Sequence, residues 1–323
     1  MKTSRRAALA FAAASLLAAT VAQADTWPSR PIRLIVPFPA GGGTDIIARE
    51  LTNKLTSYGY NFVVDNKPGS GGNLGVDAAA KAAPDGYTLV LGQTSNLAIN
   101  PTLYSKLPYD PLKDLTPISL VATSPLVIVA GTATPYKTLD DLVKAAKAKP
   151  ESINFASSGN GTVAHLAMES FQKAAGIKLT HIPYKGAAQG VTDVISGQVQ
   201  LYVSSVPTLL PHIKSGKMHP LALTSLQRAA DLPQVPTVAE SGYKGFEAIT
   251  WFGIAGPAGL PKDIVAKLNT DINKALQDTA LKQKLSGQGA DVQGSSAADF
   301  GKLIRDDIPR WGKLVKDSGA KVD

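Results

Sequence analysis

The stretch VPFPAGGGTDIIAR, residues 36–49, places three consecutive glycines between an apolar run and a helical pattern. The run Ile32–Phe38 predicts a strand, and the spacing of apolar residues in Thr44–Tyr58 predicts a helix. Glycine loses more conformational freedom on folding than any other residue, so a turn made of Gly41–Gly43 calls for a reason. The first N–H groups of a helix have no internal acceptor and attract anions. The glycines would let an anion approach these groups closely.

The same arrangement recurs in NFASSGNGTVAH, residues 154–165. A predicted strand is followed by Ser157–Gly161, and a predicted helix starts at Thr162. The serine and threonine hydroxyls add hydrogen-bond donors beside the free amides. Two such helix starts would form a clamp for a small carboxylate. Each turn by itself is also explained by an ordinary strand-to-helix connection, with Thr44 or Asp45 capping the first helix.

The N-terminus has the features of a secretory signal peptide over residues 1–24. A basic start with Lys2, Arg5 and Arg6 precedes an apolar stretch, and Ala22-Gln23-Ala24 forms a cleavage site. The arginine pair leaves Sec or twin-arginine export open. Removing the signal lowers the net charge from +8 by the three basic residues. The chain contains no cysteine, which excludes disulfides and thiolate chemistry. A periplasmic location is therefore predicted.

Several function classes find no support in the motifs. The basic residues form no cluster with interleaved aromatics, so no nucleic-acid partner is expected. No glycine turn is a Walker A loop, and GSGGNLG, residues 69–75, misses the dinucleotide fingerprint because its last glycine comes one residue late. The four histidines make no metal-ligand spacing, and no G-x-S-x-G elbow occurs. We therefore expect no cofactor, no metal and no catalytic residues.

From Ile32 onward, short strand-like runs alternate with helical ones, which is typical of an α/β fold with a largely parallel sheet. The long strand Leu120–Ala130 is expected to be interrupted at Ser124-Pro125, and the proline-rich segment Thr94–Asp114 to be mostly loop. Two C-terminal helices are expected, Lys262–Lys274 and Ala297–Gly319. The interrupted strand and a return strand at Leu221–Thr224 predict two lobes with two crossings. We expect lobe one at 25–123 plus 224–323, and lobe two at 124–223.

The sequence resembles one receptor family along the whole mature chain. The matching motifs, in order, are WPSRPIRLIVPFPAGGGTDIIAR, NKPGSGGNLGVDAAAKAAPDGYTL, NPTLY, SSGNGTVAHL, PYKGAAQ and ISGQVQLYVSSVPTLLPHIKSGK. They resemble the Bug-type receptors, the periplasmic solute-binding proteins of tripartite tricarboxylate transporters. The resemblance implies a two-lobed periplasmic-binding-protein fold of type II character, with the ligand cleft between the lobes. It also implies a small organic mono-, di- or tricarboxylate ligand and delivery to separate membrane permease subunits. We expect a monomer.

The resemblance also implies the ligand-binding residues. These are Pro39, Ala40, Gly41, Gly42, Gly43, Thr44, Thr94, Ser95, Ser157, Ser158, Gly159, Asn160, Gly161, Thr162, His165, Ser204 and Ser205. His165 could reach the ligand through water or could cap its helix. Lys185 is placed near the cleft or in solvent, and Trp251-Phe252 at the cleft wall or in the core. Many relatives carry an acid where this chain has Gln200, which argues against an amino-acid ligand if that acid contacts ligand ammonium groups.

Two alternatives to the transport receptor remain open. A periplasmic hydrolase or isomerase acting on a carboxylate in the same cleft would need a serine, a histidine and an acid within hydrogen-bond reach. A sensory protein that presents bound ligand to a membrane kinase would share the fold and the ligand.

Overall fold

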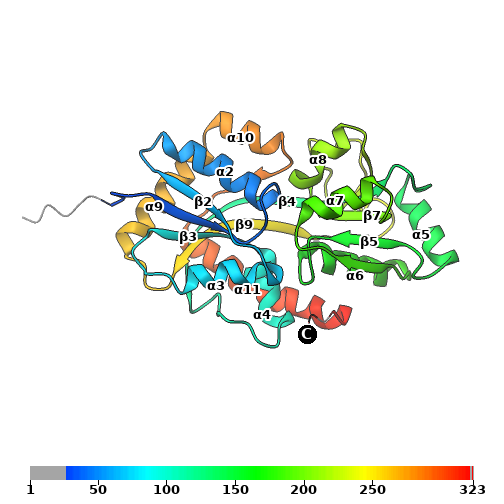
Figure 1. Cartoon of the computed structure of the whole chain (residues 1–323), viewed down its shortest axis with the longest axis horizontal. Coiled ribbons are helices and arrows are strands. Elements are labelled where there is room, and N and C mark those ends of the chain that lie inside the picture. Colours follow the sequence, from blue (N-terminus) through cyan, green and yellow to red (C-terminus); the bar gives the residue numbers. More distant parts are fainter. Residues whose placement is uncertain (1–26, 321, 323) are drawn as a thin grey trace, which may run out of the picture.

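The computed structural model describes residues 27–320 and residue 322. The predicted signal peptide, residues 1–24, lies outside the described residues. The strands follow the order β2-β1-β3-β9-β4-β7-β5-β6, and β8 and β10 pair with β4 beside this path. Strand β4 (Leu115–Gly131) runs through the whole molecule and joins two groups of strands (Figure 1). We call each group, with the helices packed on it, a lobe. Within the described residues no helix has the length and apolar character needed to cross a membrane.

Lobe one contains the first part of β4 and five other strands: β1 (Ile32–Val36), β2 (Phe62–Asn66), β3 (Thr88–Gln93), β9 (Ile249–Pro257) and β10 (Asp291–Val292). One face of this sheet carries α2 (Gly43–Thr56), α9 (Lys262–Leu276) and α10 (Thr279–Ser286) (Figure 1). The other face carries α3 (Asn73–Ala80), α4 (Asn100–Leu103) and α11 (Ala297–Ser318), together with the short turns η1 (Ser70–Gly72) and η2 (Ser95–Ile99).

Lobe two contains the second part of β4 and four other strands: β5 (Asn154–Ser157), β6 (Thr180–Pro183), β7 (Leu201–Ser205) and β8 (Met218–Leu223). Its helices are α5 (Leu139–Ala148), α6 (Val163–Ala175), α7 (Ala187–Ile195) and α8 (Val206–Lys214). Helices α7 and α8 lie on one side of its strands and α6 lies on the other (Figure 1). Each lobe is therefore an α/β layer structure with helices on both faces.

The expectation of a largely parallel sheet is wrong for the centre of the molecule. Strands β1, β2 and β3 run parallel, as do β5, β6 and β7. Strand β9 is antiparallel to both β3 and β4, and β4 is antiparallel to β7 and β8. The reason is that β4 leaves lobe one for lobe two, whereas β9 brings the chain back in the opposite direction.

The predicted interruption at Ser124-Pro125 is also wrong, because β4 continues through it. Pro125 forms the last pair of the ladder with β9, opposite Ile249. The ladder with β7 starts one residue later, at Leu126. Proline lacks the N–H group that a ladder uses. At this changeover between two ladders the missing group disrupts neither of them.

Three chain segments lie side by side where the lobes join. The hydroxyl of Thr224 accepts a hydrogen bond from the Leu126 amide (2.9 Å) and donates to the Ala248 carbonyl (2.6 Å). The segment between β8 and β9 packs Leu232 and Val235 into the same apolar cluster as Val127 of β4. The predicted division of the chain at residue 224 stays a prediction.

Two further elements differ from the sequence-based expectation. The segment Thr94–Asp114 contains a π-helical turn, η2, followed directly by α4, in place of a loop. Pro101 fits there because it lies in the first turn of α4, where its missing N–H group has no internal acceptor anyway. A third C-terminal helix, α10, was not predicted. Its signal is Asp278, whose side chain accepts from the Leu281 amide and caps the helix.

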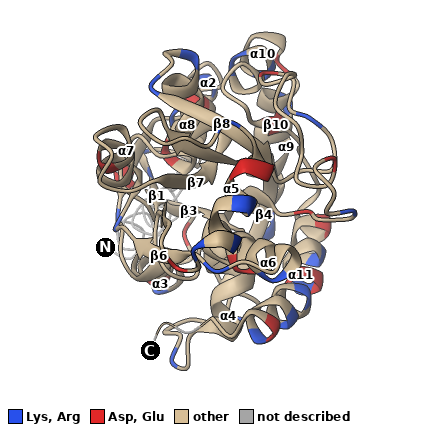
Figure 2. Ribbon diagram, turned by 90° about the vertical axis from the view of Figure 1, so that its right-hand side faces the viewer, with Lys and Arg blue, Asp and Glu red and all other residues tan. Residues whose placement is uncertain are grey.

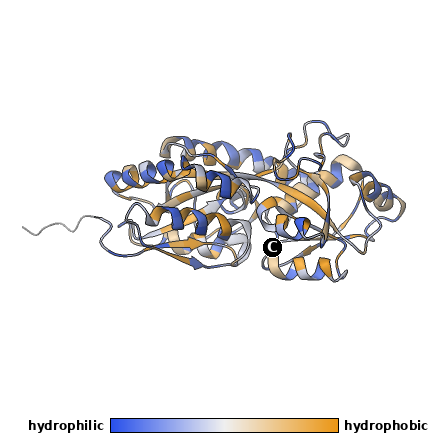
Figure 3. Ribbon diagram, turned by 90° about the horizontal axis from the view of Figure 1, so that it is seen from above, coloured by the Kyte–Doolittle hydropathy of each residue, from blue (hydrophilic) through white to orange (hydrophobic). Residues whose placement is uncertain are grey.

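The apolar core follows the strands, while the charged residues lie on the outer sides of the helices. Strands coloured as hydrophobic run between helices whose outward sides are hydrophilic (Figure 3). Positive and negative residues alternate along α11 (Figure 2), where Lys302 pairs with Asp306 and Lys313 with Asp317. Such exposed pairs at i,i+4 spacing contribute little stability. The excess positive charge is thus spread over the surface.

Candidate functional site

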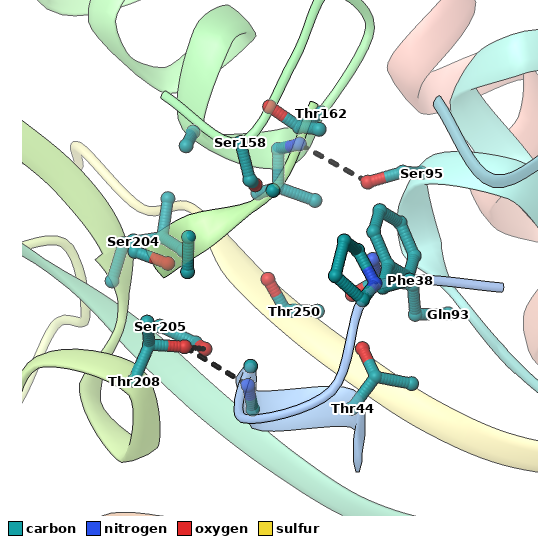
Figure 4. A pocket seen from close by; sticks show the side chains of 18 residues that line it. Phe38, Thr44, Gln93, Ser95, Ser158, Thr162, Ser204, Ser205, Thr208 and Thr250 are labelled. Carbon is teal, nitrogen blue, oxygen red and sulfur yellow. Dashed lines mark hydrogen bonds between the residues drawn. The ribbon is translucent and has the colours of Figure 1, made fainter. Parts of the chain in front are cut away.

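A cavity of about 50 Å³ lies between the lobes, and the N-termini of four helices surround it. It is lined by 18 residues, ten of which are labelled in Figure 4. They are Phe38, Pro39, Gly42, Gly43, Thr44, Gln93, Ser95, Leu126, Ser158, Thr162, Val163, Ala164, Gly186, Ala187, Ser204, Ser205, Thr208 and Thr250. Every one of these residues is uncharged. The local electrostatics therefore come from backbone dipoles and hydroxyl groups.

Helix α2 opens onto the cavity from lobe one. Its N-cap is Gly42, which has no side chain to bind the first amides, so Thr44 and Asp45 are not the N-cap residues proposed from the sequence. The loop before α2 is held instead by hydrogen bonds to the Asp45 carboxylate. Its Oδ2 accepts from the Gly41 amide at 2.9 Å, and its Oδ1 accepts from the Asn66 side-chain amide at 2.9 Å. The first-turn amides of α2 are thereby left facing the cavity.

Asp45 remains ionised although it is only 3% exposed. Burial alone would raise the pKa of its carboxyl group, but hydrogen bonds from Arg49, Gly41 and Asn66 outweigh burial and hold the pKa below its ordinary value. Arg49 reaches Asp45 at 2.9 Å on the same helix. Asn66 also donates to the Phe38 carbonyl at 3.0 Å. The Asp45 carboxylate therefore holds the glycine loop directly at Gly41 and, through Asn66, at Phe38.

Helix α6 opens onto the cavity from lobe two. Its N-cap Thr162 accepts from the His165 amide at 3.4 Å, and the loop before it carries Ser158 toward the cavity (Figure 4). Gly159 and Gly161 in this loop have positive φ angles of 134° and 76°. Such angles favour glycine. The turn therefore depends on these glycines to bring the chain from β5 into α6.

Two further helix starts complete the site. Helix α7 begins after Gly186 and helix α8 after Ser205, and neither has a side-chain cap. Of the four helices at the cavity, α2, α7 and α8 therefore have no side-chain cap, whereas α6 is capped by Thr162. Uncapped first-turn amides carry the positive end of the helix dipole. Their convergence makes the cavity a site for an anion held by backbone groups.

The site residues predicted from the sequence fall into two groups. Nine of them line the cavity: Pro39, Gly42, Gly43, Thr44, Ser95, Ser158, Thr162, Ser204 and Ser205. The others lie beside or behind it: Ala40, Gly41, Thr94, Ser157, Gly159, Asn160, Gly161 and His165. Thr94, for example, is fully buried and accepts from the Trp251 amide at 2.9 Å, which ties η2 to β9.

Gln93 also lines the cavity, and it begins the loop Gln93–Asn96, from which the resemblance implies further ligand contacts. The other eight lining residues were not predicted: Phe38, Leu126, Val163, Ala164, Gly186, Ala187, Thr208 and Thr250. Gly186-Ala187 follows a predicted strand, so the signal used for the first two turns could have found it. Thr208 lies inside α8 and Thr250 inside β9, and no local pattern distinguishes either residue.

The structure also places four residues whose roles the sequence left open. Lys185 is exposed on a groove next to the cavity. Trp251 and Phe252 are core residues, 4% and 1% exposed, and the Trp251 indole donates to Asp307 at 2.6 Å. Gln200 lies away from the cavity, where its side chain accepts from the Asn154 amide. Gln200 does not line the cavity, so the lack of an acid at position 200 does not bear on whether the ligand carries an ammonium group.

His165, which is buried, and His181, which is half-buried, form a stacked pair beside the α6 loop. Their ring centroids are 4.2 Å apart, and Phe155 stacks on the other side of His181 at 4.7 Å. His181 Nε2 is 2.7 Å from Ser157 Oγ, and Glu169 lies 3.8 Å from His165 Nε2. Burial lowers the pKa of His165 to about 4, and burial together with the neighbouring His165 lowers the pKa of His181 to about 3.

We expect this pair to make the protein sensitive to acid. In the unfolded chain both histidines titrate near pH 6.5, whereas in the fold they stay neutral until about pH 4 and 3. The free energy of unfolding is therefore highest above pH 6.5 and falls as the pH drops toward the pKa values of the folded state, by on the order of 5 kcal/mol at pH 4.5 for the two histidines together. Urea unfolding at pH 7.5 and 4.5 measures this change. The variant carrying His165→Gln and His181→Gln should show a smaller difference between the two pH values, and an equal difference would contradict the assignment.

Comparisons with known proteins agree with this geometry. The model of the tripartite tricarboxylate transporter family receptor matches residues 47–320. Protein BugT of Bordetella pertussis is 42% identical over 314 residues, which cover 97% of this chain and 96% of BugT. A Rhodopseudomonas palustris protein solved with adipate superposes with a TM-score of 0.89 at 35% identity, covering 92% of this chain and all of that one. MatC from the same organism, solved with bound malate, superposes with a TM-score of 0.84 at 30% identity, covering 90% of this chain and all of MatC.

These similarities extend over nearly the whole described chain. They confirm the two-lobed α/β fold of periplasmic solute-binding proteins that the sequence predicts. The cavity lined by helix N-termini lies between the two lobes of this fold. The chain belongs to the family of tripartite tricarboxylate transporter receptors.

Proposed function

We propose that this receptor captures a small organic carboxylate in the cavity between its lobes and delivers it to the membrane permease subunits of a tripartite tricarboxylate transporter. The observation that carries the proposal is the convergence of four helix N-termini on a cavity without charged side chains. Backbone amides at helix starts bind anions. An ammonium group would find no carboxylate in this lining, so an amino acid is a poor ligand.

The charge of the cavity favours a dicarboxylate among the mono-, di- and tricarboxylates. Each helix start contributes roughly half a positive charge, so four of them together balance about two negative charges. They also come from both lobes: α2 from lobe one, and α6, α7 and α8 from lobe two. A molecule with one carboxylate at each end would contact both sides at once. Similar receptors solved with adipate and malate support this choice.

The absence of enzymatic activity is part of the proposal. The nearest approach to a catalytic pair is Ser157 Oγ and His181 Nε2, at 2.7 Å. Ser157 is fully buried, and neither residue lines the cavity. The two rings that stack on His181 belong to His165 and Phe155, and neither residue is an acid. A nucleophile in this position would have no access to a bound molecule.

The proposal also covers the cellular location of the receptor, its partners and its motion on binding. Export by the N-terminal signal peptide would place a monomeric receptor in the periplasm. Presentation of the bound acid to a sensor kinase is a second role that the same fold could serve. Ligand binding would favour a closed state reached by hinge motion at the joining segments, near Ser124, Thr224 and Ala248–Thr250.

A thermal-shift screen tests the proposal. Residues 25–323 would be unfolded, dialysed and refolded to remove any bound acid, then melted with malate, adipate, citrate, benzoate and glutamate. We expect a saturable rise in melting temperature with malate or adipate, little change with glutamate, and recovery of the acid unchanged. No rise with any carboxylate would refute carboxylate capture, and chemical conversion of an acid would revive the enzyme alternative.

A further inference from the structure

Among the described residues that line the cavity, two hydrogen bonds join one lobe to the other, and they mirror each other. The amide of Gly43, the first residue of α2 in lobe one, donates to Thr208 Oγ1 of lobe two at 2.9 Å. The amide of Val163, the first residue of α6 in lobe two, donates to Ser95 Oγ of lobe one at 3.2 Å. Both bonds are drawn as dashed lines in Figure 4. Each lobe thus supplies a hydroxyl that satisfies the first amide of a helix in the opposite lobe.

These groups are buried at the contact between the lobes. Ser95 is 1% exposed, Val163 2% and Thr208 7%. The first amide of a helix has no acceptor within its own helix. Within each lobe, Gly42 offers α2 no side chain, and Thr162 is used by the His165 amide. The two bonds therefore exist only while the lobes are in contact, and opening the cleft breaks both of them.

We propose that Ser95 and Thr208 are positioning residues that set the balance between the open and closed states by capping the helices of the opposite lobe. This inference rests on the proposed function, because it assigns these residues a role in closure around a bound acid. Each hydroxyl accepts from an amide, which leaves its own hydrogen available as a donor. Both residues line the cavity, where that hydrogen can reach a carboxylate oxygen. The Ser205 hydroxyl lies 3.2 Å from Thr208 Oγ1 and can extend the chain of hydrogen bonds that starts at the Gly43 amide.

Closure and binding are linked through these hydroxyls. The positive end of the α2 dipole acts on the cavity through the Thr208 hydroxyl of lobe two. The positive end of the α6 dipole acts on it through the Ser95 hydroxyl of lobe one. A hydrogen-bonded chain strengthens its members when it ends on a charged acceptor. The arrangement is complete only when both lobes contribute, so a carboxylate is bound most tightly in the closed state.

The test measures the closed fraction directly. Because the chain has no cysteine, Ser57→Cys on lobe one and Gln198→Cys on lobe two provide two exposed positions for spin or fluorescent labels. The distance distribution between the labels is recorded without added acid and during titration with malate and with adipate. Thr208→Val and Ser95→Ala each remove one hydroxyl. Without acid, each should lower the ratio of closed to open molecules roughly five-fold, the effect of losing one neutral hydrogen bond.

Three further variants separate closure from other effects. Ser204→Ala removes a hydroxyl that lines the same cavity but forms neither of the two bonds across it, and it should leave the closed fraction measured without acid unchanged. Thr138→Val removes the cap of α5 within lobe two and should lower stability without opening the cleft. Thr208→Ser keeps the hydroxyl and should restore the closed fraction that Thr208→Val loses.

The outcomes are distinguishable from failure of the proposed function. If neither malate nor adipate binds the parent protein, carboxylate capture is in doubt, but the closed fraction measured without acid still decides the role of the two hydroxyls. A closed fraction unaffected by both Thr208→Val and Ser95→Ala would overturn the inference. Equal losses in Ser204→Ala would also overturn it, because they would show a general effect of the cavity lining.

Discussion

Replacing Gly186 by alanine is expected to weaken carboxylate binding by roughly 10- to 100-fold while leaving the protein folded. A Cβ atom at Gly186 would lie 2.4 Å from Cγ of Pro39 in the opposite lobe. The proline ring cannot rotate away, so the lobes would have to stay apart, and relieving such overpacking costs about 1–3 kcal/mol. The backbone of Gly186 is extended (φ 169°) and accepts an alanine without strain. Calorimetric titration with the acid found in the screen measures the loss.

The matched control for this variant removes the ring that the new methyl group would strike. Pro39→Ala in the Gly186→Ala background should restore a large part of the affinity, because the remaining side chain is shorter. Pro39→Ala by itself defines the effect of losing the ring from the cavity wall. Unchanged affinity in Gly186→Ala would show that the lobes do not approach each other at this contact during binding.

The second large effect is expected in the core, where Gly253→Ala should destabilise the fold by about 3 kcal/mol or more. Gly253 lies on β9 beneath α11, and its Cβ atom would come within 2.1 Å of the tip of the Phe300 ring. Phe300 is fully buried and packs edge-on against Trp251 at 5.6 Å, so its ring has no free space to enter. Urea unfolding monitored by circular dichroism measures the change.

A double variant checks the mechanism of this destabilisation. Phe300→Leu removes the outer ring atoms that the new methyl group meets, so the Gly253→Ala and Phe300→Leu changes should cost less together than the sum of the two alone. Strict additivity would indicate that the clash is not the cause. Because Gly253 does not itself line the cavity, the affinity of the folded fraction should be retained.

Much of the candidate site could be predicted because the features that form it are local in sequence. Glycine at the end of a strand followed by a helix defines a helix start with free amides, and this pattern marks Gly42 and Gly43 as well as the turn before Val163. The dipole and the free amides belong to the helix itself and need no distant partner. Nine predicted residues accordingly line the cavity.

Other features depend on contacts between residues far apart in the chain. Thr208 is 165 residues from Gly43, and Ser95 is 68 residues from Val163, so no sequence window contains either pair. The stacked His165 and His181 belong to a helix and to an edge strand. The π-helical turn η2 occurs where the prolines suggested a loop, because tertiary contacts outweigh weak local preferences.

The amino-acid sequence by itself determined the fold class, the receptor family and the two glycine turns that open onto the ligand site. These follow from backbone conformation, hydrophobic period and motif order, all of which act over short stretches. Only the tertiary structure decided that four helix starts meet at one cavity and that the lobes cap each other's helices through Ser95 and Thr208. The physical reason is that an uncapped amide acquires its partner from whichever lobe the completed fold brings within hydrogen-bond distance.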